Sequence, residues 1–203
     1  RLDGYKIFLG LPPDLSVQVM DDYIDAFKLT NPGLVSLQEE ANSILSSVRD
    51  ASASPDLNFL EDWYRQTLKL LPQSEKFFLD LTADYQVLES ALPARKQGFE
   101  SLRKRTDLLQ LGMNIDTFSN DDIDQLVIEL NASLGGIRTS LNTLSNNILA
   151  WESKNKNRSL AVARTELSAL LNAYSGTLLE LSLTQASARL ESIVMQEAIE
   201  IGR

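Results

Sequence analysis

The stretch Ile123–Trp151, IDQLVIELNASLGGIRTSLNTLSNNILAW, contains the pattern that decides the fold. Its apolar residues recur with gaps that alternate between four and three, which is typical of a coiled-coil seam. They are Ile123, Val127, Leu130, Leu134, Ile137, Leu141, Leu144, Ile148 and Trp151. The residues between them are mostly Asn, Ser, Thr and Gly. A helix with one apolar edge is not stable alone in water, so the stretch predicts partner helices.

The same spacing predicts helices on both sides of this stretch. Asn31-Pro32 is typical of a helix start, and the apolar repeat after it runs to Val48, before a loop at 51–54. A last helix is expected from about Ser159 to about Ile193. Its seam comprises Leu160, Ala163, Leu167, Leu170, Tyr174, Thr177 and Leu181, beside a second row of Leu171, Leu178, Gln185 and Ala188.

The longest seam follows Ser54-Pro55-Asp56 and keeps one phase across Pro72 and Pro93. It comprises Leu57, Leu60, Tyr64, Thr67, Leu71, Ser74, Phe78, Leu81, Tyr85, Leu88, Leu92, Arg95, Phe99, Leu102, Thr106 and Leu109. Two separate helices would have no reason to keep one phase, so we interpret residues 56–111 as one long, bent helix, ended by Gly112. The alternative is a break at Pro72, with a new helix starting at Gln73-Ser74.

These patterns predict an all-α fold, an antiparallel bundle of about four long, coiled-coil-like helices. Residues 1–31 are expected to form a connector, with the end of a preceding helix at 1–9, a proline-rich extended turn at 11–15, a short strand at 16–20 and a helical turn at 23–29. Residues 32–193 form the bundle domain, and residues 194–203 the start of a following element. Both ends of the sequence fall inside patterns, so we expect it to be a piece of a longer protein.

Composition excludes several kinds of chemistry. The 203 residues are 43% hydrophobic, carry a formal net charge of −9, and contain neither histidine nor cysteine. Histidine acid–base catalysis, cysteine nucleophiles, thiolate metal sites and disulfides are therefore excluded. An acidic chain does not favour nucleic acid, and there is no apolar run long enough for a membrane-spanning helix.

Two charged clusters are candidate sites. The densest acidic group is Asn120, Asp121, Asp122 and Asp124. It lacks the alternating oxygen ligands, the glycine and the distal glutamate of a calcium loop, so we interpret it as the start of a helix. The basic run Arg103-Lys104-Arg105, with Arg95 and Lys96 upstream, could dock an acidic partner, but a solvated helix face is the better interpretation.

Other features also have a plain structural explanation. Gly135-Gly136 could mark a bend or close helix crossing, or simply a tolerated weak point, and the sequence does not decide between them. Trp63, Tyr64 and Trp151 stand at helical spacing and are expected in the core. Glu39 and Glu40 point to different sides of a helix and cannot share a substrate. The sequence therefore contains no candidate catalytic, cofactor-binding or metal-binding residue and predicts no enzyme.

A family resemblance appears at the two ends. The run Tyr5–Leu15, YKIFLGLPPDL, resembles the close of the first repeat in TolC-type outer-membrane efflux proteins. Residues 188–191 (ARLE) and 197–203 (EAIEIGR) are similar to the run-in of the second repeat. The match is to large variants with extra sequence between the repeats, and covers about thirty residues. The resemblance implies a periplasmic segment that contacts adaptor proteins or neighbouring protomers, with no transport residue carried over.

The first functional hypothesis is therefore a non-catalytic periplasmic module of an efflux protein, serving assembly or partner contact. The alternatives are a periplasmic ligand-sensing domain of a receptor, for which only Arg95 suggests a buried basic pocket, and a freestanding coiled-coil scaffold. A scaffold would be expected to carry Glu and Lys beside its seam, whereas the helix after Asp122 carries Asn, Ser and Thr, which favours packing within one chain.

Overall fold

A computed structural model describes residues 29–51, 56–104 and 120–201, with side chains described as far as residue 196. This part of the chain forms four helices and contains no strand. They are α3 (Pro32–Asp50), α4 (Leu57–Arg103), α6 (Asp121–Asn155) and α7 (Leu160–Ile201). The all-α bundle is therefore confirmed. The expected elements at 1–28, the loop residues 52–54, the end of the long helix after Lys104 and its stop at Gly112 lie outside the described residues.

Each helix buries the seam that its sequence predicts. In α6 all nine seam residues are buried except Val127, which is half-buried. In α3 the buried residues include Leu34, Leu37, Ala41, Ile44 and Val48. In α4 the seam is buried at most positions from Leu60 to Leu102, although Leu57 at its start is exposed.

The long helix is continuous, so the alternative break at Pro72 is wrong. Pro72 and Pro93 both lie inside α4. Both are on the solvent side, where water can satisfy the carbonyl group that loses its donor. The 47 residues of α4 span about 70 Å. The last helix also extends further than expected, since α7 passes Ile193 without a break and continues to Ile201.

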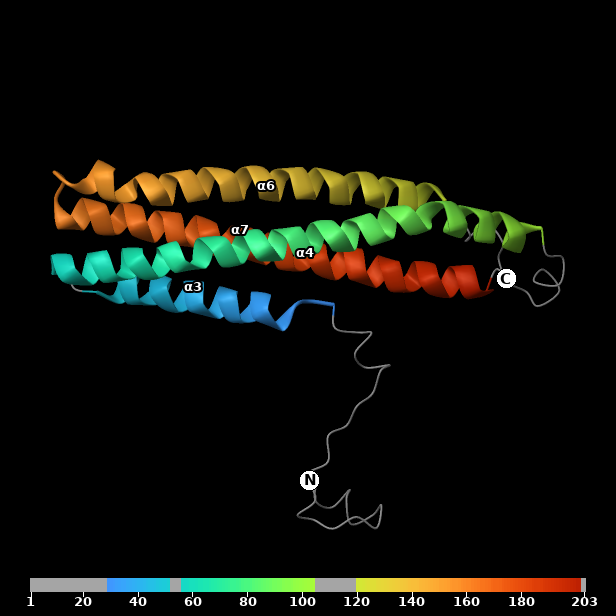
Figure 1. Ribbon diagram of the computed structural model, residues 1–203, viewed down its shortest axis with the longest axis horizontal. Coiled ribbons are helices and arrows are strands. Elements are labelled where there is room, and N and C mark those ends of the chain that lie inside the picture. Colours follow the sequence, from blue (N-terminus) through green and yellow to red (C-terminus); the bar gives the residue numbers. More distant parts are fainter. Residues whose placement is uncertain (1–28, 52–55, 105–119, 202–203) are drawn as a thin grey trace, which may run out of the picture.

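The arrangement of the helices follows from which pairs touch. α7 packs against each of the other three helices, and its most extensive contact is with α4. Figure 1 shows α4 and α7 running in the same direction through the middle, with α6 along one side and the shorter α3 along part of the other. Helices that follow one another in sequence are antiparallel, as expected, but the central pair is parallel. Sequence spacing indicates which face of a helix is buried, not which neighbour covers it.

Hydrogen bonds confirm the register of the central pair. The Tyr174 hydroxyl donates to the backbone oxygen of Leu70 at 2.9 Å, and Gln185 Nε2 donates to Asp84 Oδ2 at 2.9 Å. Both contacts join residues just over one hundred positions apart, as expected for parallel helices in one register. In residues 29–51, 56–104 and 120–201, no helix is both long and apolar enough to cross a bilayer.

Candidate functional site

A connected group of polar side chains lies where α3 begins, between α4 and α7. Asn31 caps α3, because its side chain accepts a hydrogen bond from the Gly33 backbone N–H at 2.9 Å. Its own backbone N–H donates to Gln185 Oε1 at 3.2 Å, and its Nδ2 donates to Asp80 Oδ2 at 3.3 Å. One residue therefore ties the start of α3 to both central helices.

Gln185 and Asp84 continue this group into the core. The Gln185 side chain is fully buried, and both ends of its amide are used, one by Asn31 and one by Asp84. The same Asp84 oxygen accepts from Arg189 Nε at 2.8 Å, and this ion pair is about three-quarters buried. We call Asn31, Asp80, Asp84, Gln185 and Arg189 the clamp. Its carboxylate and amide groups are bound to one another, so the clamp fixes helix positions and offers no free reactive group.

Sequence reasoning missed the clamp. Gln185 falls in the second apolar row of the last helix, and a glutamine in an apolar row is the one sequence signal of a buried polar contact. Its partners lie about a hundred and a hundred and fifty residues away, so no local pattern could identify them.

The end of the bundle where α6 turns into α7 contains a groove of about 620 Å³. Trp151 Nε1 donates to the Ala163 backbone oxygen at 3.1 Å, and Asn155 Nδ2 donates to Glu166 Oε2 at 2.6 Å. Arg158 pairs with Glu166 at 3.5 Å. The Asn155 side-chain oxygen is buried and has no hydrogen-bond partner in the part of the chain that the structure describes. The other polar groups named here hold the α6–α7 turn closed.

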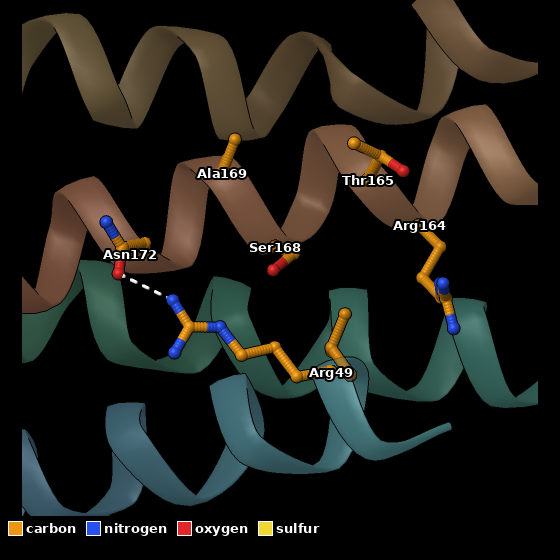
Figure 2. Close-up of a pocket in the computed structure, with 7 residues that line it drawn as sticks. Arg49, Arg164, Thr165, Ser168, Ala169 and Asn172 are labelled. Atoms are coloured by element: carbon orange, nitrogen blue, oxygen red, sulfur yellow. Dashed lines mark hydrogen bonds between the residues drawn. The ribbon is translucent and has the colours of Figure 1, made fainter. Parts of the chain in front are cut away.

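A shallower groove, of about 390 Å³, runs between the end of α3 and α7 (Figure 2). Arg49 Nη2 reaches across it to Asn172 Oδ1 at 2.9 Å. Arg164 Nη1 donates to the backbone oxygen of Ala51 at 2.7 Å, which stabilises the end of α3. Both guanidinium groups are thus engaged with the protein.

The acidic cluster formed by Asn120, Asp121, Asp122 and Asp124 lies at the start of α6. Asn120 precedes the helix as expected, but its side chain makes no capping bond and accepts from Arg95 Nη1 at 3.5 Å instead. Asp121, Asp122 and Asp124 occupy the first turn, and Asp124 pairs with Lys96 at 2.7 Å. No cluster of acidic side chains able to hold a metal ion occurs in the described part of the chain.

Arg95 is the residue that could suggest a ligand pocket. It is buried, its guanidinium carbon lies 4.2 Å from the centre of the Phe99 ring, and its Nε has no hydrogen-bond partner among the described residues. Burial lowers the pKa of Arg95, while the carboxylates of Glu191, Asp124 and Asp122 oppose that shift. Three nearby carboxylates already balance its charge and would repel an anionic ligand. Of the basic run, Arg103 and Lys104 are exposed, and Arg105 lies outside the described residues.

The remaining candidates are structural. Tyr64 and Trp151 are buried and stacked, with ring centres 4.9 Å apart, while half-buried Trp63 stacks on exposed Phe59 at 6.1 Å. Burial, and secondarily Glu152, raises the pKa of Tyr64. Glu39 and Glu40 are exposed. A side chain added at Gly135 or Gly136 would touch nothing within 4 Å, so a close helix crossing does not explain these glycines.

Comparison with known protein families, with curated proteins and with solved structures finds no match to this chain. The resemblance to TolC-type efflux proteins therefore stays a prediction from the residues at the two ends.

Proposed function

We propose that this chain is a non-catalytic helical module whose role is mechanical, bracing an assembly and presenting a helix face to a protein partner. The observation that carries the proposal is the parallel pair of α4 and α7. The two helices span about 70 Å and about 63 Å. Tyr174 and the clamp hold them in one register. Two long helices held in one register keep the ends of the module at a fixed distance and in a fixed direction, which is what a brace requires.

The polar groups of the core support this interpretation. Those of the clamp and of the α6–α7 turn are used to hold one helix against another. The charge of Arg95 is balanced by neighbouring carboxylates. A reaction centre needs side chains that converge on a space where a substrate can sit, and the grooves described above do not combine these two features.

The setting we propose is the periplasmic part of an outer-membrane efflux protein of the TolC type. The support is the resemblance at the two ends of the sequence, together with a bundle whose own seams are buried within one chain. Adaptor proteins or neighbouring protomers would be its partners in export.

The proposal is tested in cells that produce the whole protein to which this chain belongs. We expect it in the outer-membrane fraction. Asp84→Ala, which breaks the clamp, should reduce export, whereas Leu79→Glu on the solvent face of α4 should not. Recovery in the cytoplasmic fraction, or export unaffected by Asp84→Ala at equal protein level, would contradict it.

A ligand-sensing domain is the alternative that Arg95 would favour. Thermal unfolding of the chain with small carboxylates, phosphate, amino acids and divalent cations separates the two functions. A brace predicts no change in Tm beyond about 1 °C, because no ligand binds the folded state. A rise of several degrees that disappears in Arg95→Gln would favour the sensor.

A further inference from the structure

A furrow follows the line where α4 and α6 meet. Three hollows mark its course, of about 620, 240 and 310 Å³, and residues of both helices line each of them. α6 packs more extensively against α7 than against α4, so its α4 side is the more open one. We call this the α4–α6 furrow, and its lining includes Glu61, Glu75 and Glu89 of α4 and Gly135, Arg138 and Asn142 of α6.

Two residues that disfavour a helix line the furrow. Pro72 lies inside α4 and deprives the Leu68 carbonyl group of its helical hydrogen bond. Gly135 lies inside α6, where a glycine costs about 1 kcal/mol relative to alanine. A side chain added at Gly135 would touch nothing within 4 Å, so the packing of the described residues does not require a glycine there. Local departures from the rules of stability are typical of a functional surface.

Tyr85 gives the furrow an unused polar group. Its side chain is 9% exposed and lines the hollow of about 310 Å³. Its hydroxyl makes no hydrogen bond to the described residues and is not enclosed by them, so a group that enters the furrow can bond to it. Burial, and secondarily Glu89, raises the pKa of Tyr85, so the hydroxyl keeps its proton and remains a donor.

The α4 wall of the furrow is acidic. Glu61, Glu75 and Glu89 follow one another every 14 residues, which is two heptads, so they form a row with a spacing of about 21 Å. Glu75 and Glu89 are exposed and make no ion pair with a described residue. Glu61 pairs with exposed Arg65 at 3.3 Å, a contact that contributes little in water. Among the described residues of α4, no cation lines the furrow.

The α6 wall carries the opposite charge. Arg138 is exposed in the hollow of about 310 Å³ and makes no ion pair within the described ranges. Lys156 and Arg158 line the hollow at the α6–α7 turn, beside Glu152. A helix between the two walls is therefore recognised by charge on both flanks, as the positions beside a coiled-coil seam recognise a partner.

We propose that the α4–α6 furrow binds one helix of a protein partner. The partner helix presents Lys or Arg to the glutamate row, Asp or Glu to Arg138, and an apolar stripe to Leu71, Phe78 and Leu134, which line the furrow between its walls. The inference rests on the proposed function, in which the bundle contacts a partner, and it names the surface and the chemistry of that contact.

The occupant is a helix because it has to satisfy its own backbone. The furrow runs about 42 Å from Glu61 to Glu89, and its walls are helices whose backbone groups are already bonded. An extended segment would bury N–H and C=O groups that find no ladder there. A helix of about 28 residues spans the same length and brings Lys or Arg to each glutamate when these recur every 14 residues.

Photo-cross-linking in cells that produce the whole protein tests the site. Benzoylphenylalanine at Gln86, which lines the furrow, should give an adduct with the partner. Val87 is the matched control, because it is the next residue, is 54% exposed and does not line these hollows. The cross-linked peptide, identified by mass spectrometry, should come from an amphipathic helical segment with Lys or Arg at the stated spacing. A segment without that pattern, equal adducts at the two positions, or no adduct at Gln86 would overturn the inference.

Filling the furrow provides a second readout. Gly135→Phe should weaken the Gln86 adduct by about tenfold or more, because the ring occupies the space of the partner helix. Gly136→Phe is the matched control, since Gly136 is also exposed and unpacked but does not line the hollows, and it should change the adduct by less than about twofold. Urea denaturation should show that neither variant is less stable than the wild type. A full-strength adduct in Gly135→Phe would contradict the site.

Charge reversal tests the chemistry of the partner. Glu75→Lys with Glu89→Lys should weaken the adduct by about tenfold or more, because two attractions become repulsions. Glu39→Lys with Glu40→Lys changes the net charge equally on the exposed side of α3 and should have no effect. Equal losses in the two double variants would remove the role of the glutamate row. Adducts confined to positions outside the furrow would refute this site and leave partner contact standing, whereas no adduct at any exposed position would refute both.

Discussion

Tyr174 provides the sharpest test of how the central helix pair is held. Its side chain is fully buried, and its hydroxyl donates to the Leu70 backbone oxygen at 2.9 Å. Tyr174→Phe removes that bond and leaves the ring in place. A single hydrogen bond contributes about 1 kcal/mol to folding, so we expect the free energy of unfolding to fall by about that amount at pH 8.

Urea denaturation measures the change. Tyr85→Phe is the matched control, because Tyr85 is also buried in α4 but its hydroxyl makes no hydrogen bond to the residues that the structure describes. It should change the free energy of unfolding by less than about 0.5 kcal/mol. Equal effects of the two substitutions would refute the proposed role of the Tyr174–Leu70 bond.

The pH dependence of the same variant is a second test. Burial raises the pKa of Tyr174 to about 12, with a smaller upward effect of Glu40 and an opposing effect of the Ser74 hydrogen bond. Below pH 10 the phenol is protonated in both folded and unfolded chains. Between pH 10 and 12 the unfolded chain loses the proton first, so the wild-type chain loses up to about 3 kcal/mol of stability. Tyr174→Phe lacks that loss, so its stability should overtake that of the wild type in this interval. Parallel curves would contradict the burial of the hydroxyl.

Three further substitutions test separate features. Pro72→Ala should raise the free energy of unfolding by about 2 kcal/mol if α4 is continuous, because alanine restores a helical hydrogen bond, and no gain in urea denaturation would indicate a break. Asp84→Ala should lower it by about 2 kcal/mol, since the buried Gln185 amide loses its acceptor, and an unchanged midpoint would rule out that role for the clamp. Gly136→Ala should raise Tm, because alanine favours a helix more than glycine does. Gly33→Ala should lower Tm, because the added carbon would lie 2.9 Å from the Phe77 ring. Equal shifts of Tm in the two variants would argue against the packing at the start of α3.

Much of the fold can be predicted from the spacing of apolar residues alone. The seam from Ile123 to Trp151 predicted the buried face of α6, and Asn31-Pro32 predicted the start of α3, where the Asn31 cap is seen. The unbroken phase across Pro72 predicted the continuity of α4. These features depend on residues close together in sequence, and periodic burial of one helix face makes them visible.

The rest depends on which helix meets which. Alternating directions make α4 and α7 parallel, but nothing local indicates that they are neighbours, or that Gln185 is buried because Asp84 and Asn31 satisfy its amide. The sequence predicts that the last helix ends near Ile193. The next residue unfavourable to a helix is Gly202, and α7 extends to Ile201, immediately before it.

The central claim is that α4 and α7 lie side by side in the same direction. Double electron–electron resonance, which measures the distance between two spin labels, tests it most directly. The chain has no native cysteine, so the labels attach only at cysteines introduced for the purpose. Labels at Val87 and Leu190, both exposed, should be close, whereas labels at Val87 and Val162 should be about 40 Å apart along the bundle axis. The labelled chain is diluted with unlabelled chain so that only distances within one copy are seen. The account predicts that the first distance is shorter by more than about 15 Å, and the reverse order would contradict it.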